Sequence, residues 1–214
     1  MRKNTLVSIA ALLALAAAVA SLILSQRGPK IELGPYQALG AVAAEETVKL
    51  LGNKGQIVVI TKDSSEFKMP ALEAQLRTFT DTLKSKGGVS IAAIEKVKMD
   101  PMTAMATGGG IPSDQFLEIM RRLPNIGAVV LFVSFPSLAE RDFTALKKSN
   151  TKIVVVSGCM PGYKNLLQTQ NIHVAIIPRF DDRSETLKKP KTLREWFDQE
   201  YLVVTPATAA FLPY

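Results

Sequence analysis

The chain has 214 residues, a formal net charge of +7, one cysteine and one histidine. A single cysteine excludes an intrachain disulfide, and a single histidine all but excludes zinc sites built from His and Cys clusters and most histidine-dependent catalysis. The lysines and arginines are spread along the chain without a nucleic-acid-binding motif, so a solvated basic surface is favoured over a nucleic-acid partner. We expect no bound metal or cofactor.

The N-terminal stretch has the pattern of a membrane-inserting segment. Arg2 and Lys3 precede an apolar run that starts at Thr5 and ends at Leu24, close to the ~20 residues that a helix needs to cross a bilayer. Positive charge keeps the N-terminal end in the cytoplasm, so the rest of the chain is expected to face the periplasm or exterior of a bacterial inner membrane. An uncleaved anchor is favoured because the apolar run continues past the A-x-A pattern that ends at Ala20; cleavage near Ala20, followed by secretion, is the alternative.

Three regions follow from this pattern. Residues 1–26 are assigned to a signal anchor or signal peptide, residues 27–35 to a linker, and residues 36–214 to a single α/β domain. The linker assignment rests on Gly28-Pro29 and Gly34-Pro35, because Gly-Pro pairs interrupt a helix rather than continue it.

The domain alternates helical and strand patterns along its whole length. Apolar residues at helical spacing predict helices at residues 39–51, 70–86, 116–123, 139–146, 163–167 and 193–200. Short apolar runs predict strands at residues 56–61, 89–97, 128–133, 152–156, 172–177 and 202–205, the last at an edge. Residues 99–110 are expected to form a loop. Ser137 to Glu140 and Thr192 to Glu195 each match a capping box that opens a helix.

Strands that alternate with helices define the fold class. They predict βαβ units, and hence a doubly wound, mainly parallel sheet with helices on both faces. Ligands of such sheets bind where the strands end at their carboxyl edge. The polar residues expected there are Asp63, Ser64 and Ser65 after the first strand, Ser134 after the third, and Ser157 and Cys159 after the fourth.

Cys159 also supports a competing interpretation. A thiol at a strand end is well placed to act as a nucleophile, which would make the protein a hydrolase or a transferase. His173 would have to be its base, yet His173 begins a different strand and is expected at the opposite, amino end of the sheet. A small buried thiol is therefore favoured over a catalytic one.

Two further motifs are weighed against simpler explanations. Met99, Met102 and Met105 form a repeated thioether pattern that can bind Cu(I), but methionines that fill a gap in the core are favoured. Gly108-Gly109-Gly110 precedes a helix but lacks the Lys-Ser/Thr of a P-loop and the spacing of a dinucleotide fingerprint, so a flexible connection is favoured over an anion site.

Several segments occur in an order that is shared with a known family. They are residues 41–60, Phe79-Thr80-Asp81-Thr82-Leu83, Leu123-Pro124-Asn125-Ile126-Gly127-Ala128-Val129, and residues 153–158. These segments resemble the second lobe of type I periplasmic sugar-binding proteins of the ribose-binding kind. The resemblance spans residues 36–178, and it implies one lobe of that fold and a sugar-binding role in transport.

The departures from the family pattern concern the residues that hold the sugar. Gln75 stands near a position where the family often has arginine, Ser134-Phe135 near a polar pair, and Gly158-Cys159 near an acidic residue. The family's first lobe has no counterpart. The resemblance therefore implies the fold more strongly than the activity.

These observations predict a membrane-anchored, solute-binding-like domain without catalysis, which binds a small carbohydrate-like ligand or a protein partner. The candidate ligand-binding residues are Asp63, Ser64, Ser65, Gln75, Ser134, Ser157 and Cys159. A one-lobe cleft is open, so the affinity is expected to be modest unless a transporter permease or a second copy of the chain supplies the other wall. An exposed apolar Phe135-Pro136 is expected to favour such a partner.

Overall fold

The computed structural model describes residues 15, 16, 18, 19, 21, 31–156, 162–179 and 189–212. The chain divides into two compact units, Met1–Glu32 and Leu33–Tyr214. In the first unit Leu15, Ala16, Ala18, Val19 and Ser21 are helical, and the rest of the predicted span between Thr5 and Leu24 lies outside the described residues. Among the residues that are described, no helix combines the length and the hydropathy needed to traverse a bilayer.

The second unit alternates helices and strands in the predicted order. Its elements are α2 (Gly34–Leu50), β1 (Gly55–Lys62), α3 (Pro70–Lys86), β2 (Val89–Val97), α4 (Pro101–Ala106), α5 (Ser113–Arg122), β3 (Ala128–Leu131), α6 (Glu140–Ser149), β4 (Lys152–Val156), α7 (Tyr163–Gln168), β5 (Val174–Pro178), α8 (Leu193–Glu200), β6 (Tyr201–Val204) and the 3₁₀ turn η1 (Ala209–Phe211). Gly34 and Pro35, which the sequence places in a linker, form the first turn of α2, where proline has no helical hydrogen bond to lose.

The strands form one sheet in the order β2-β1-β3-β4-β5-β6. The first five strands pair in parallel, and β6 lies antiparallel to β5 at the edge. Parallel neighbours align in register, with Ile57 opposite Ala128 and Val154 opposite Val174. The predicted doubly wound, mainly parallel sheet and its edge strand are therefore confirmed.

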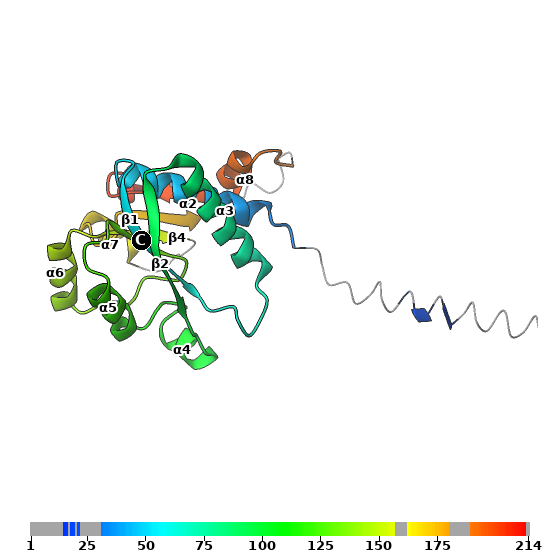
Figure 1. Ribbon diagram of the computed structural model, residues 1–214, viewed down its shortest axis with the longest axis horizontal. Helices are drawn as coiled ribbons and strands as arrows, with labels where there is room; N and C mark the ends of the chain where they lie inside the picture. Colours follow the sequence, from blue (N-terminus) through cyan, green and yellow to red (C-terminus); the bar gives the residue numbers. More distant parts are fainter. Residues whose placement is uncertain are drawn as a thin grey trace, which may run out of the picture. The chain divides into compact units, whose positions relative to one another are not determined.

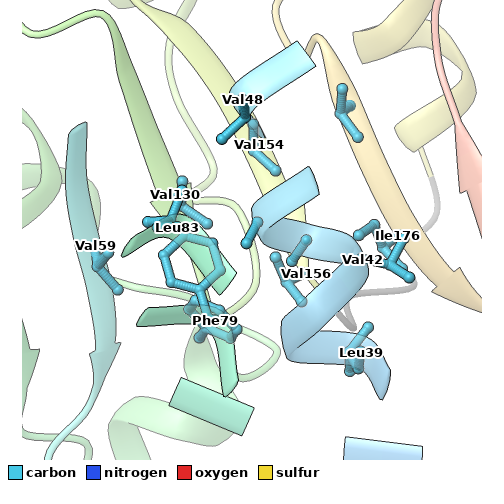
Figure 2. Packing of buried hydrophobic residues seen from close by; sticks show 14 of the residues in the cluster. Leu39, Val42, Val48, Val59, Phe79, Leu83, Val130, Val154, Val156 and Ile176 are labelled. Carbon is cyan, nitrogen blue, oxygen red and sulfur yellow. The ribbon is translucent and has the colours of Figure 1, made fainter. Parts of the chain in front are cut away.

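Helices cover both faces of the sheet, and each face has its own hydrophobic core. Figure 1 shows α2, α3 and α8 grouped on one side and α5, α6 and α7 on the other, in agreement with the two clusters of buried residues. Alternate residues of each central strand enter opposite cores, which explains why these strands are continuously apolar. Figure 2 shows the first core, where the labelled residues are Leu39, Val42 and Val48 of α2, Phe79 and Leu83 of α3, and Val59, Val130, Val154, Val156 and Ile176 of the strands.

Helix α4 was not expected, because residues 99–110 were predicted to form a loop. Asp100 caps this short helix: its carboxylate accepts hydrogen bonds from the backbone N–H groups of Met102 (2.9 Å) and Thr103 (3.0 Å). Pro101 occupies the first helical position, which proline favours. The helix has no buried residue, so it lacks the apolar periodicity by which longer helices are recognised in a sequence.

The predicted capping box at Ser137 is wrong. Helix α6 begins two residues later than that motif implies, and the N–H of Ala139 donates to the Asp142 carboxylate at 3.3 Å. The Ser137 carbonyl instead accepts a hydrogen bond from the Ser113 hydroxyl at 2.6 Å. At the second predicted motif Thr192 does cap α8, since its hydroxyl accepts from the Glu195 N–H at 3.2 Å.

Candidate ligand site

A cavity of about 330 Å³ lies at the carboxyl edge of the sheet. Its lining residues come from the ends of β1, β3 and β4, from the start of α3, and from α4 with its flanking turns. They are Lys62, Met69, Leu72, Gln75, Met99, Ala104, Gly109, Phe132, Val133, Ser134 and Val156. The volume falls within the roughly 300–1,000 Å³ of small-molecule sites, and the mixture of apolar walls with a few polar groups is also typical of them.

Gln75 is the buried polar residue of this cavity. It lies in the second turn of α3, and only 7% of its surface is exposed. Helix α3 can pack closely on α2 because Gly40 has no side chain: a Cβ at that position would clash with the Gln75 carbonyl oxygen. The close contact of the two helices therefore places the Gln75 amide at the cavity.

The opposite wall is built by the glycine-rich turn after α4. Gly109 donates its N–H to the Ala104 carbonyl at 2.8 Å, and its own carbonyl accepts from the Ser134 N–H at 3.3 Å. Gly108 and Gly109 have positive φ angles of 59° and 76°, which glycine adopts without strain. The predicted flexible connection is thus a hydrogen-bonded turn, which pairs with the extension of β3 through a parallel bridge between Gly110 and Ser134.

Lys62 supplies the charge of the cavity. It is the last residue of β1 and is half-buried, and no carboxylate is among the lining residues that the structure describes. Within the part of the chain that the structure describes, Lys62 forms no ion pair. The cavity therefore combines one cation, the Gln75 amide and the Ser134 hydroxyl with apolar walls.

The structure separates the candidate ligand-binding residues into three groups. Gln75 and Ser134 line the cavity, whereas Asp63, Ser64 and Ser65 are not among its lining residues. The Asp63 carboxylate instead accepts the N–H of Ser65 at 3.0 Å. This backbone hydrogen bond, together with the Ser65 hydroxyl, lowers the pKa of the Asp63 carboxyl. Asp63 and Ser65, which were expected to contact a ligand, thus form hydrogen bonds with each other within the turn.

Ser157 and Cys159 lie outside the described residues, but His173 can be placed. His173 precedes β5 at the amino edge, where its Nδ1 accepts a hydrogen bond from the Ile153 N–H at 3.2 Å. Ile153 is three residues from the end of β4, which corresponds to roughly 10 Å along a strand. Burial, with the charge of Lys152, lowers the pKa of His173 to about 4. These features describe a neutral structural histidine at the edge opposite the cavity.

The three methionines have different environments. Met99 packs against the second core and lines the cavity. Met102 and Met105 are 77% and 82% exposed on the surface of α4. The prediction that the methionines fill a gap in the core therefore holds for Met99 but not for Met102 and Met105.

Phe135 and Pro136 are buried, so the prediction that they form an exposed apolar site is wrong. Phe135 is only 3% exposed, and its ring contacts those of Phe116 and Phe143 at centroid distances of 5.9 Å and 6.2 Å. The second core takes up this aromatic cluster because the chain turns inward after β3 and lies under α5 and α6.

Several cavity residues were absent from the sequence-based list. Lys62 directly follows the strand predicted at residues 56–61 but was not singled out, and Met69, Leu72 and Phe132 carry no motif. The signal that could have found Lys62 is its position at the end of a buried strand, since a charged residue there must leave the core at the ligand-binding edge.

Comparison with known proteins gives the fold a context. No family model and no curated protein matches the sequence. Among solved structures, AraP, an arabinose binding protein from Geobacillus stearothermophilus, matches with a TM-score of 0.53 and 16% identity, over 82% of this chain and 62% of AraP. The sugar-binding protein of a sugar ABC transporter from Bacillus halodurans matches with a TM-score of 0.56 and 15% identity, over 83% and 64% of the two chains.

A third match is a XylFII–LytSN complex, with a TM-score of 0.53 and 16% identity, over 81% of this chain and 60% of that one. The chain thus spans less than two thirds of the length of each of these structures. They show that the Leu33–Tyr214 unit has the fold of a periplasmic-binding-protein-like lobe, and the predicted resemblance is confirmed at the level of the fold.

Proposed function

We propose that the chain is an extracytoplasmic solute-binding-like domain that binds a small, carbohydrate-like ligand in the carboxyl-edge cavity and does not catalyse a reaction. The observation that carries this proposal is Gln75, a largely buried residue that lines the cavity and whose amide forms no hydrogen bond with the described residues, so that it is available to a ligand. An amide at a cavity wall can exchange its hydrogen bond with water for one with a ligand hydroxyl, and a hydrogen bond of this kind is typically worth about 0.5–1.5 kcal/mol. The sugar-binding proteins that share the fold support the same ligand class.

The cavity has the chemistry that a sugar requires. A sugar hydroxyl donates and accepts hydrogen bonds, and the Gln75 amide and the Ser134 hydroxyl can each do both. The apolar C–H surface of a sugar ring would lie against Met69, Leu72 and Phe132. The cavity is open on one side, so a ligand would leave part of its surface in water and bind with modest affinity.

Calorimetric titration with monosaccharides tests the proposal, and arabinose is the first to try. Gln75→Leu should weaken binding by roughly tenfold or more, because a hydroxyl of the bound sugar would lose its partner. Gln168→Leu is the matched control: Gln168 is exposed on α7, on the other face of the sheet, and does not line the cavity. Equal affinity of the two variants, or no binding by the unaltered chain to any monosaccharide, would contradict the proposal.

We further propose that the segment between Thr5 and Leu24 anchors the domain on the outer side of a bacterial inner membrane. Its support is the sequence pattern alone: positive charge followed by an apolar run of sufficient length. Mass spectrometry of the native N-terminus in fractionated cells tests it. A membrane-bound chain that retains residues 1–26 is expected, and a soluble cytosolic chain that retains them would contradict the anchor.

The partner that we propose is a second copy of the chain, which would cover the open side of the cavity. Phe67 is 77% exposed on the segment that leads to Met69, and Met102 and Met105 are exposed on α4. We call these three residues the apolar rim. A neighbour of the same fold, XylFII, was solved in a complex with LytSN, which supports partner binding by such domains.

Sedimentation velocity tests the apolar rim. The unaltered chain should form dimers that Phe67→Ser with Met105→Ser disrupts, because apolar contacts in the interface are lost. Phe211→Ser is the control, since Phe211 is 86% exposed on η1. A monomer in every case would contradict the second copy and leave a transporter permease as the proposed partner.

A further inference from the structure

We infer that the ligand of the carboxyl-edge cavity is anionic, namely a sugar that carries a carboxylate, which binds next to Lys62. This inference rests on the proposed function and specifies its substrate class. Its starting point is the set of lining residues, which among the described parts of the chain contains one cation and no carboxylate. A ligand with one negative charge complements this set, whereas a neutral sugar leaves the ammonium group of Lys62 without a charged partner in the cavity.

The carboxylates of the neighbouring loops contact other groups and, among the described residues, form no ion pair with Lys62. Asp63 accepts the N–H of Ser65 at 3.0 Å, and Glu66 lies 3.9 Å from Lys98. Asp100 accepts the N–H groups of Met102 and Thr103, and the Thr103 hydroxyl donates to it at 2.6 Å. Each acidic residue between β1 and α3 or between β2 and α4 thus has its own partner, and none of them is among the described lining residues.

Gln75 and Ser134 show why the ligand also carries hydroxyls. The Gln75 amide at the cavity offers an acceptor oxygen and two N–H donors, whereas a carboxylate can only accept hydrogen bonds. A simple carboxylate would therefore leave the amide oxygen without a partner, and a hydroxyl on the same ligand can donate to it. The apolar walls formed by Met69, Leu72 and Phe132 fit the C–H face of a sugar ring. A ligand with one carboxylate and several hydroxyls on an apolar ring is a sugar acid.

A carboxylate fits this cavity better than a phosphate. A phosphomonoester carries nearly two negative charges and three acceptor oxygens, and such groups are usually held by arginine forks or by several converging backbone N–H groups. The described residues that line the cavity include one lysine and no arginine. The N–H groups of Gly108, Gly109 and Gly110 donate to the carbonyls of Met105, Ala104 and Thr107, so they are already used.

The test compares ligands of matched shape and different charge on the full chain. Glucuronate, glucose and glucose 6-phosphate are titrated by calorimetry into the unaltered chain, Lys62→Gln and Lys54→Gln. Lys54 is an exposed lysine just before β1, at the opposite edge of the sheet, so its variant changes the net charge without touching the cavity. Thermal unfolding of each variant shows whether it is folded.

We expect the unaltered chain and Lys54→Gln to bind glucuronate with an affinity at least roughly tenfold higher than their affinity for glucose. A charge-assisted hydrogen bond from Lys62 to the carboxylate would produce a difference of this size. In Lys62→Gln this preference should disappear while glucose affinity changes little. Equal binding of glucose and glucuronate, or a preference that survives in Lys62→Gln, would overturn the inference and leave the proposed function standing. Tighter binding of glucose 6-phosphate than of glucuronate would overturn the assignment of a carboxylate. No binding of any of the three would overturn the inference, while the proposed function is decided separately by the titrations with arabinose and other monosaccharides.

Discussion

At the residue scale, two buried threonines differ in whether their hydroxyl groups form a hydrogen bond, and this difference predicts opposite effects of replacing them on stability. Thr61 in β1 is 1% exposed, and its hydroxyl has no hydrogen-bond partner among the described residues. Thr47 in α2 is equally buried, but its hydroxyl donates to the Ala43 carbonyl at 2.7 Å. The cost of burying a hydroxyl is therefore offset at Thr47 and not at Thr61.

Thr61→Val should stabilise the protein by about 1 kcal/mol, because valine has the same shape and removes the unpaired hydroxyl. Thr47→Val is the matched control and should give no gain, since it removes a hydrogen bond that is made. Urea unfolding at neutral pH measures both. A loss of stability in Thr61→Val would show that its hydroxyl has a partner in solution.

His173 makes the stability of the fold depend on pH. Burial, with the charge of Lys152, lowers the pKa of His173 from 6.5 to about 4. Between these two pH values the unfolded chain binds the proton and the folded chain does not, so protonation favours unfolding. Stability should therefore fall as the pH decreases from about 6.5 to about 4, and this group should contribute no pH dependence above that window.

His173→Gln tests this prediction, since glutamine can still accept the hydrogen bond from the Ile153 N–H but does not titrate in this range. Urea midpoints measured at several pH values between neutral and pH 4 should decline less steeply for the variant than for the unaltered chain. Parallel declines would mean that the histidine is protonated in the folded state at the same pH as in the unfolded chain.

At the scale of the elements, the contact between α2 and α3 determines where the cavity wall lies. Gly40 allows this contact, because a Cβ at that position would clash with the Gln75 carbonyl oxygen. Gly40→Ala should destabilise the protein by about 3 kcal/mol, the upper part of the range for overpacked sites. It should also weaken ligand binding, since α3 must move away and takes Gln75 with it.

Lys49→Ala is a suitable control for this variant, because Lys49 is exposed on the same helix. Its 3.7 Å ion pair with Glu46 lies on the surface and contributes little. Thermal unfolding and calorimetry provide the two readouts. A Gly40→Ala protein with unaltered stability would contradict the close packing of α2 and α3.

The elements also show what the sequence could predict. The strands were predicted closely, and the predicted bounds of β2 and β4 are those observed, because buried strands require runs of β-branched and apolar residues. Helix α4 was missed because one capping residue, Asp100, and one proline stabilise it, without an apolar face. The start of α6 was misplaced because the serine in the motif was not the residue next to the helix.

At the scale of the whole molecule, the cavity results from contacts between segments far apart in the chain. Polar residues near strand ends were identified by type, yet only Gln75 and Ser134 of the described candidates line the cavity. Lys62, Met69 and Phe132 were not singled out, because their contribution depends on how α3 and the turn after α4 pack at the edge of the sheet. Local sequence patterns predict the fold class, but they do not predict which side chains at the carboxyl edge of the sheet point into the cavity.

The methionines allow a direct test of where a ligand binds. Met69 and Met99 line the carboxyl-edge cavity, whereas Met120 lines a different cavity of about 420 Å³ between α5 and α6. With the methionine methyl groups labelled with ¹³C, each of these residues reports on its own site in an NMR titration. Substitution of each methionine by leucine assigns the signals.

Titration with glucuronate should shift the methyl signals of Met69 and Met99 in a saturable way and leave the signal of Met120 unchanged. This result would locate the ligand at the carboxyl ends of the strands. A shift of Met120 without shifts of Met69 and Met99, or no shift at saturating ligand, would contradict the claim that this cavity is the binding site.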